Sequence, residues 1–454
     1  MRQLSLKYED SLLGKSCKAT ERIDIFSSSR ILGWLSGAVK KLPRSERLEF
    51  FMERALEFGF GLFIFSLILS PNLIGIVKGF STSLSLYLSD ILLSVLCILL
   101  ILKKSFEASS WQRSSLDIPF FFYISFTIFS TARGILIGTI DNPFVSMLYL
   151  VKNLEYVIMF YLALNIVDTT DKLKRYLFWW FGAAAVLSAY GIYEHFHPFD
   201  FVRGFYRIYE RGLFFGQANH FAGFLMFMIS LAVALIISLG KKVQKMMLSV
   251  LITMMFFALL WTYSRQVYFA LFLALSLIFL LKDKRLLIFF LLLVLIAPIF
   301  LPESVTGRIQ MLVTEAQESN IAHSTVAIRL HNWGIALSSV KDYPLMGVGL
   351  GARHRAFYDS NFVLVISELG FIGLLLFIFF LFSAVRSLVR CYRQRSDIFI
   401  KAVALGCLGG LIGIVAQGFF SVSFIISRIA GPLFCMLGMV LGAGERINEP
   451  DFRA

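Results

Sequence analysis

Long apolar runs recur through most of this chain. From Phe58 to the C-terminus, predominantly apolar stretches follow one another, separated by short charged loops, and many reach the length of about 18 residues that a membrane span needs. In hydrocarbon every backbone N–H and C=O must be paired within the protein, which leaves α-helices or a closed barrel. The runs lack the alternation of barrel strands. The sequence therefore predicts an all-α polytopic membrane protein.

The composition agrees with this class. Hydrophobic residues make up 58% of the chain and charged residues only 16%, whereas a soluble domain carries about 25% charged residues. The net charge of +14 would also suit a nucleic-acid-binding protein. Most of the basic residues, however, flank the apolar runs, where they set the orientation of membrane spans. We therefore expect contact with membrane lipids and none with nucleic acid.

About twelve spans are predicted, each near the length that a bilayer requires. They are 56–76, 82–102, 117–138, 143–166, 174–194, 212–239, 246–263, 265–281, 286–302, 361–384, 399–418 and 421–443. Every second loop is strongly basic, which predicts that both termini are cytoplasmic. One long extracytoplasmic loop, 303–360, has room for short helices, and its part from Thr325 to Val340 has a helical pattern.

Arginines gather on the side that this topology places outside. Arg203, Arg207 and Arg211 are spaced by four, Arg265 falls in a tight outer turn, and Arg329 lies in the long loop. Arginine on the outer side opposes the topology rule, and a guanidinium group binds phosphate in a bidentate manner. The group predicts an anionic substrate. The alternative is that these arginines pair with outer acidic residues or with lipid phosphates.

Several motifs in this region resemble a known family. The segments Arg211–Ala222, Thr262–Arg265, Arg329–Trp333, Tyr343–Gly351 and Asp359–Gly373 are similar to the core shared by O-antigen ligases and by O-antigen or exopolysaccharide polymerases. The last three segments form a single block, so three blocks occur in the order, with the spacing and on the side of the membrane that the family shows. The expected organisation is a basic arm (1–54) with an interfacial helix or a disordered stretch, N-terminal spans (55–202), the family core (203–373), and C-terminal spans with a cytoplasmic tail (374–454).

The resemblance implies a metal-independent glycosyltransferase without a cofactor, on the extracytoplasmic face of a bacterial inner membrane. Its donor would be a glycan on undecaprenyl diphosphate, and its acceptor a sugar hydroxyl of a glycan or of a lipid-linked glycan. Other polysaccharide-assembly proteins are candidate partners. By the same resemblance, Arg211 and Arg265 match the positions that hold the diphosphate. The candidate substrate-binding residues are Arg203, Arg207, Arg329, His354 and Glu368.

The sequence departs from the ligase pattern at one place. Where ligases carry a His-Asn pair, this chain has Asp359 followed by Ser360. A carboxylate can act as a general base, so Asp359 is a candidate catalytic residue and the departure favours a polymerase. The alternative is that Asp359 caps the helix that follows. His354 and His220 are the candidates for the missing imidazole.

Three other functions remain open. An O-antigen ligase would join finished glycan to lipid A-core or to protein. A flippase or other transporter would place polar sites at the bilayer midplane, and a scaffold would not need the arginines.

Within the fourth span, Lys152 and Glu155 share a helical face and predict a structural ion pair. Arg133 and Arg428 could add to the donor site or extend to the membrane interface.

Overall fold

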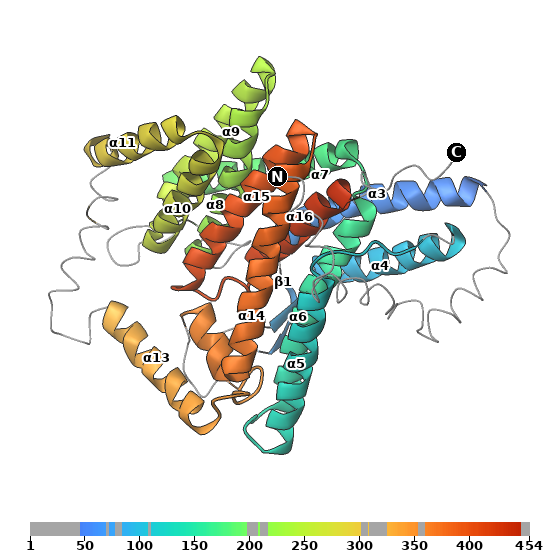
Figure 1. Cartoon of the computed structure of the whole chain (residues 1–454), viewed down its shortest axis with the longest axis vertical. Coiled ribbons are helices and arrows are strands. Elements are labelled where there is room, and N and C mark those ends of the chain that lie inside the picture. The colour runs from blue at the N-terminus through green and yellow to red at the C-terminus, as the bar shows by residue number, and fades with distance from the viewer. Residues whose placement is uncertain are drawn as a thin grey trace, which may run out of the picture. The chain divides into compact units, whose positions relative to one another are not determined.

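The computed structural model of the chain describes residues 46–69, 72–77, 84–107, 110–197, 208, 217–300, 307, 325–352 and 359–445. These residues are helical apart from a short strand pair, connecting turns and loops (Figure 1). Within them, nine helices are long and apolar enough to cross a membrane, which confirms the predicted fold class. These are α5 (Asp117–Leu136), α6 (Pro143–Ile166), α7 (Thr170–Phe196), α8 (Ala218–Ser238), α9 (Lys242–Leu260), α10 (Arg265–Lys282), α14 (Asn361–Gln394), α15 (Ile398–Gly418) and α16 (Ser427–Glu445).

Three of the twelve predicted spans need correction. The span expected at 56–76 is replaced by α3 (Glu46–Leu69), which begins inside the expected polar arm and ends before Pro71, a residue that cannot continue the hydrogen-bonding ladder. The span expected at 82–102 begins with β2 (Leu84–Tyr87), which pairs antiparallel with β1 (Asn72–Val77) and leads into α4 (Leu88–Glu107). The span expected at 286–302 corresponds to α11 (Lys284–Phe300), whose 17 residues fall just short of the others.

Two finer predictions are confirmed. The apolar stretch around 246–281 consists of two helices, α9 and α10, joined by a tight turn in which Tyr263 has a φ of 49°. In the long loop, α13 (Thr325–Asp342) covers the stretch where a helix was expected.

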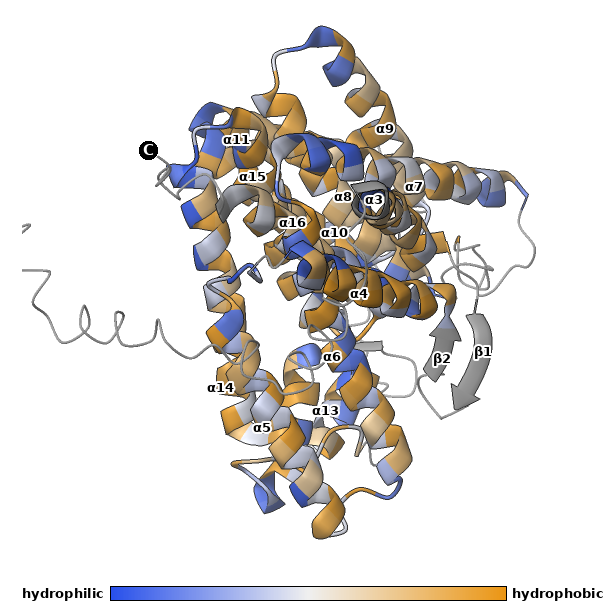
Figure 2. Cartoon of the chain, turned by 90° about the vertical axis from the view of Figure 1, so that its right-hand side faces the viewer, coloured by the Kyte–Doolittle hydropathy of each residue, from blue (hydrophilic) through white to orange (hydrophobic). Residues whose placement is uncertain are grey.

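Small residues on α15 allow the neighbouring helices α8 and α10 to approach it closely. A Cβ on Gly406 would lie 2.7 Å from Leu231 Cα of α8, and one on Gly409 would lie 2.6 Å from Ile278 of α10. Such contacts bring backbones together where apolar lipid gives no hydrophobic driving force for association. Figure 2 shows that apolar residues dominate the lengths of the helices. Since α8, α15 and α16 are mostly buried, they form the centre of this bundle.

The chain divides into two compact units. The smaller comprises residues 1–56 and 97–111, and in its described part Met52 packs with Phe106 while Lys103 lies 3.5 Å from Glu53. The larger comprises residues 57–96 and 112–454 and contains the nine long helices. The domain boundaries expected from the sequence remain predictions, as does the orientation of the spans.

Candidate functional site

Two of the sequence motifs meet at one end of the bundle. The Ser264 hydroxyl, at the N-cap position of α10, donates to Asn219 Oδ1 near the start of α8 at 2.8 Å. Arg265 is the first residue of α10 and is half-buried. The motifs that begin at Arg211 and at Thr262 are therefore neighbours in space, although Asn219 and Ser264 are 45 residues apart in the sequence.

The end of α15 connects these motifs to a third. Gln417 is fully buried and its Nε2 donates to the backbone carbonyl of Asn219 at 3.2 Å. The next residue, Gly418, accepts from the Ser360 hydroxyl at 3.4 Å. The helices α8 and α10 thus begin side by side, and α14 begins beside the end of α15. The sequence reasoning missed Gln417, although an amide at the end of an otherwise apolar run was a visible signal.

Asp359 forms an ion pair with Arg329 at this end of the bundle. Arg329 Nε of α13 lies 3.6 Å from Asp359 Oδ2, and the two side chains are 27% and 26% exposed. Burial raises the pKa of Asp359 above its ordinary value, while the Arg329 charge opposes that shift. The pair is longer than a hydrogen bond, so neither group is saturated by the other.

The capping alternative for Asp359 is wrong. The N-cap residue of α14 is Ser360, and its side chain makes no capping hydrogen bond. Asp359 lies one residue earlier, outside the position whose side chain normally accepts from the first helical N–H groups.

Glu368 lies deeper than a substrate-binding role would suggest. It is 2% exposed, and its Oε1 accepts from the Gly351 backbone N–H at 3.0 Å. We call residues 343–352, which follow α13, the glycine segment. Side chains near the end of α5 hold it from the other side: Ser130, Arg133 and Thr139 donate to the carbonyls of Met346, Gly347 and Val348 at 2.7, 3.0 and 2.6 Å.

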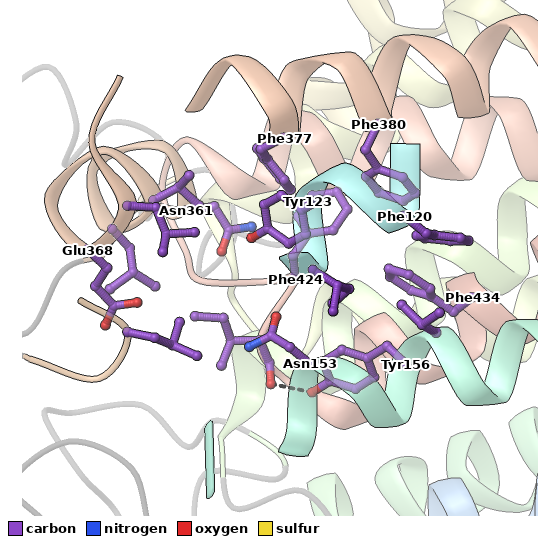
Figure 3. A pocket seen from close by; sticks show the side chains of 17 residues that line it. Phe120, Tyr123, Asn153, Tyr156, Asn361, Glu368, Phe377, Phe380, Phe424 and Phe434 are labelled. Carbon is purple, nitrogen blue, oxygen red and sulfur yellow. Dashed lines mark hydrogen bonds between the residues drawn. The ribbon is translucent and has the colours of Figure 1, made fainter. Parts of the chain in front are cut away.

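A small cavity lies among α5, α6, α14 and α16 (Figure 3), and Leu350 of the glycine segment is one of its lining residues. Asn153, Asn361 and Glu368 line it together with a group of aromatic side chains. Asn361 is 1% exposed, and its Nδ2 has no hydrogen-bond partner among the described residues. The volume is about 50 Å³, well below the ~150 Å³ of a cavity that binds benzene. It therefore has room for water but not for a sugar ring.

Four of the predicted residues are not among those that the structure describes. Arg203, Arg207, Arg211 and His354 lie outside the described residues. Of the two additional arginines, Arg133 contacts the glycine segment and Arg428 lies over the Tyr87 ring, with its Cζ 5.6 Å from the centroid. Among the described residues, no group of three or more His, Cys, Asp or Glu side chains could hold a metal ion. Independence from metals and cofactors remains a prediction.

Comparison with known proteins finds a family match over part of this site. No curated protein matches the chain. Residues 250–378 match the family described as O-antigen ligase. The matched segment contains Arg265, Arg329, Asp359 and Glu368, whereas Arg203, Arg207 and Arg211 precede it. This match confirms the resemblance of the chain to the O-antigen ligase and polymerase superfamily.

Proposed function

We propose that the protein is a glycosyltransferase that moves a glycan from undecaprenyl diphosphate to a sugar hydroxyl on the extracytoplasmic face of a bacterial inner membrane. The observation that carries the proposal is the partly exposed Arg329–Asp359 pair, within the family segment and at the bundle end where the motifs converge. A carboxylate with a raised pKa, beside a guanidinium group that is not fully engaged, suits a reaction that needs both a base and an anion-binding group.

In the proposed reaction, the Asp359 carboxylate accepts the proton of the acceptor hydroxyl. The acceptor oxygen bonds to the anomeric carbon of the donor, and the bond between that carbon and the diphosphate oxygen breaks. The lipid diphosphate leaves with the electron pair. Arg265 and Arg329 stabilise its growing negative charge, and we assign Arg211 to the same role, with Arg203 and Arg207 nearby in the sequence.

The backbone supports an anionic leaving group at this position. The N-termini of α8, α10 and α14 lie at the same end of the bundle. Helix N-termini carry partial positive charge and unpaired N–H groups, so they favour anions. Three such ends beside Arg265 and Arg329 form a positive environment that does not require a metal ion.

Polymerisation of O-antigen or exopolysaccharide repeat units is the reaction we favour. The reason is Asp359, which stands where ligases carry a histidine. Ligation of finished glycan to lipid A-core or to protein is the second candidate, supported by the match to the ligase family. Deletion of the gene separates the candidates on a gel of surface glycan. A polymerase mutant leaves single capped units, and a ligase mutant leaves bare core. A flippase mutant, the more distant alternative, leaves intermediates that face the cytoplasm.

Substitutions at Arg265 test the anion-binding role directly. Arg265→Ala should abolish glycan transfer in membranes, and Arg265→Lys should lose most of it because an ammonium group cannot form the bidentate contact. Arg285→Ala is a matched control, since Arg285 is an exposed arginine just after α10. Full transfer by Arg265→Lys would remove the bidentate role and leave only bulk charge.

The proposed orientation has its own test. Cysteines introduced at the exposed residues Ser338 and Ser396 should react with an impermeant maleimide from opposite sides of the membrane, Ser338 from outside. Reaction of both from one side would overturn the topology and with it the extracytoplasmic site.

A further inference from the structure

The helix α14 is interrupted at Gly370, and the glycine segment fills the interruption. Gly370 has a φ of 68° and a ψ of −168°, far from helical values. In an unbroken helix, the N–H groups of Phe371 and Ile372 would donate to the carbonyls four residues earlier. They donate instead to Pro344 and Leu345 of the glycine segment, at 2.8 and 3.2 Å.

The exchange is reciprocal. The carbonyls of Ser367 and Glu368, which lose their helical donors, accept from the N–H groups of Val348 and Gly349 at 3.1 and 2.8 Å. Non-helical backbone within a membrane protein is tolerated only where its polar groups find partners in the protein. The glycine segment provides these partners. A side chain at Gly347 would overlap the Glu368 carbonyl, so only glycine allows this approach.

Two charged side chains hold the glycine segment from opposite directions. Glu368 Oε1 accepts from Gly351 N–H at 3.0 Å. On the α5 side, Arg133 Nη1 donates to the Gly347 carbonyl at 3.0 Å, and its Cζ lies 5.2 Å from the centre of the Tyr343 ring. Hydrogen bonds to charged groups are stronger than those between neutral groups.

The glycine segment is continuous with α13. The segment begins at Tyr343, directly after α13 ends at Asp342, and α13 carries Arg329. Farther along α13, Ala336 packs against Leu364 of α14 and Val422. Arg329 is therefore held opposite Asp359 by the apolar packing of α13 on α14 and by the glycine segment at its end.

We infer that Glu368 and Arg133 are positioning residues, which clamp the glycine segment and so keep Arg329 opposite Asp359. Neither contacts the substrate. The sequence-based assignment of Glu368 to substrate binding, and of Arg133 to the donor site, is replaced by an indirect role for both. The inference rests on the proposed function for its effect on transfer, but its effect on the glycine segment can be measured separately.

The decisive variants are Glu368→Gln and Glu368→Leu. The glutamine keeps an oxygen that accepts from Gly351 N–H and loses only the charge, so Glu368→Gln should retain most of the transfer. Glu368→Leu removes the acceptor and should lower transfer about 10²-fold, the cost of misplacing a reacting group by about 1 Å. Asp141→Asn is the control, since Asp141 is an exposed carboxylate in the turn after α5.

A second measurement reports on the glycine segment without transfer. Val348 is 1% exposed, so a cysteine in its place should resist a water-soluble maleimide while the segment is clamped. Glu368→Leu should make it reactive, and Glu368→Gln should leave it protected. Labelling of the parent protein, with its native cysteines, gives the background. Should Glu368→Leu fail to fold, Arg133→Leu provides the same test from the α5 side, with reactivity at Val348→Cys and a smaller loss of transfer.

Three results would overturn the inference. The first is that Glu368→Gln loses transfer although Val348→Cys stays protected. The second is that Glu368→Leu transfers normally. The third is that Glu368→Leu loses transfer but Val348→Cys does not become more reactive. Failure of the proposed function is distinguishable from these, because the native protein would then show no transfer, or Asp359→Asn and Arg265→Ala would transfer normally. In that case the labelling pattern of the Glu368 variants would still be as described.

Discussion

Two ion-paired sites in this protein differ in geometry and in accessibility. In the first, Lys152 Nζ lies 2.7 Å from Glu155 Oε2 and 2.9 Å from Asp90 Oδ2, and the three side chains are 17%, 9% and 16% exposed. In the second, Arg329 and Asp359 are 3.6 Å apart and each is about a quarter exposed. The first site has the short distances of a closed structural tie. The second leaves both partners open to a third group.

The difference follows from the cost of burying charge. Charges within a membrane bundle must be paired closely, because an unpaired one is expensive. Lys152 meets this need with two carboxylates on different elements, α6 and α4. At the second site, Arg329 Nε has no hydrogen-bond partner among the described residues. A buried donor without a partner is costly, so the Arg329 pairing is less complete than that of Lys152.

The largest predicted effect concerns the open site. Asp359→Asn keeps the shape of the side chain and removes the basic carboxylate. Loss of a general base costs about 10²–10⁴-fold in rate, so glycan transfer should fall by that factor while the amount of inserted protein stays unchanged. The measurement is transfer in membranes or with purified protein. Asp342→Asn, at an exposed carboxylate at the end of α13, should behave like the native protein. Near-normal transfer by Asp359→Asn would leave this site without its base.

Disruption of the Lys152 ion pairs should lower the stability of the protein and leave glycan transfer unchanged. Lys152→Met leaves Asp90 and Glu155 without their cation, and removal of one partner of a buried pair costs about 3–5 kcal/mol. We expect that decrease in the free energy of unfolding in detergent, with unchanged transfer per folded molecule. The triple variant Asp90→Asn, Lys152→Met, Glu155→Gln should recover much of the loss. A stable Lys152→Met protein without transfer would make this cluster part of the active site.

A conservative change at Arg329 should have a smaller effect. Arg329→Lys keeps the positive charge but loses the planar fork that binds an anion and a carboxylate together. Transfer should fall about tenfold, close to the lower value of about 1.5 kcal/mol for a hydrogen bond to a charged group. Steady-state kinetics on the donor lipid measure this loss. An identical rate for the lysine variant would show that the site needs only charge.

The smallest effect is a shift in the pH dependence of transfer. Burial raises the pKa of Asp359, and the base acts only when ionised, so transfer should decline as the pH falls through this raised pKa. The acid limb should therefore lie above the ordinary aspartate value of about 3.9. Arg329→Gln removes the charge that lowers this pKa, and the residual activity should show the limb at higher pH. A limb that moves to lower pH would contradict the pairing.

The fold class and many element boundaries were predictable from local pattern. Long apolar runs predicted nine of the spans correctly, because each run must pair its backbone polar groups within its own helix. The division between α9 and α10 was also visible, from the short polar turn at Thr262–Arg265. The strand pair before α4 was not, because an apolar segment of that length has no periodicity that separates strand from helix.

The candidate site was predictable in membership and not in arrangement. The motif spacing brought Arg265, Arg329 and Asp359 into consideration, since arginines and a carboxylate on the outer side are unusual enough to notice. The sequence also predicted the Lys152–Glu155 pair, because three residues along a helix place two side chains on one face. Asp90, the third member of that cluster, comes from a different helix and carried no local signal.

The tertiary structure alone decided how these residues act. The roles of Arg133 and Glu368 depend on the glycine segment, whose backbone replaces helical hydrogen bonds at Gly370. The hydrogen bond between Arg133 and Gly347 joins residues that are 214 positions apart in the sequence. No local rule of propensity or periodicity predicts such a contact. A sequence determines which segments must be helical in a membrane, since that need is met within each segment. Whether a charged side chain forms a close ion pair or stays partly exposed is determined only when the helices pack together, because burial and partner distance are properties of the assembled bundle.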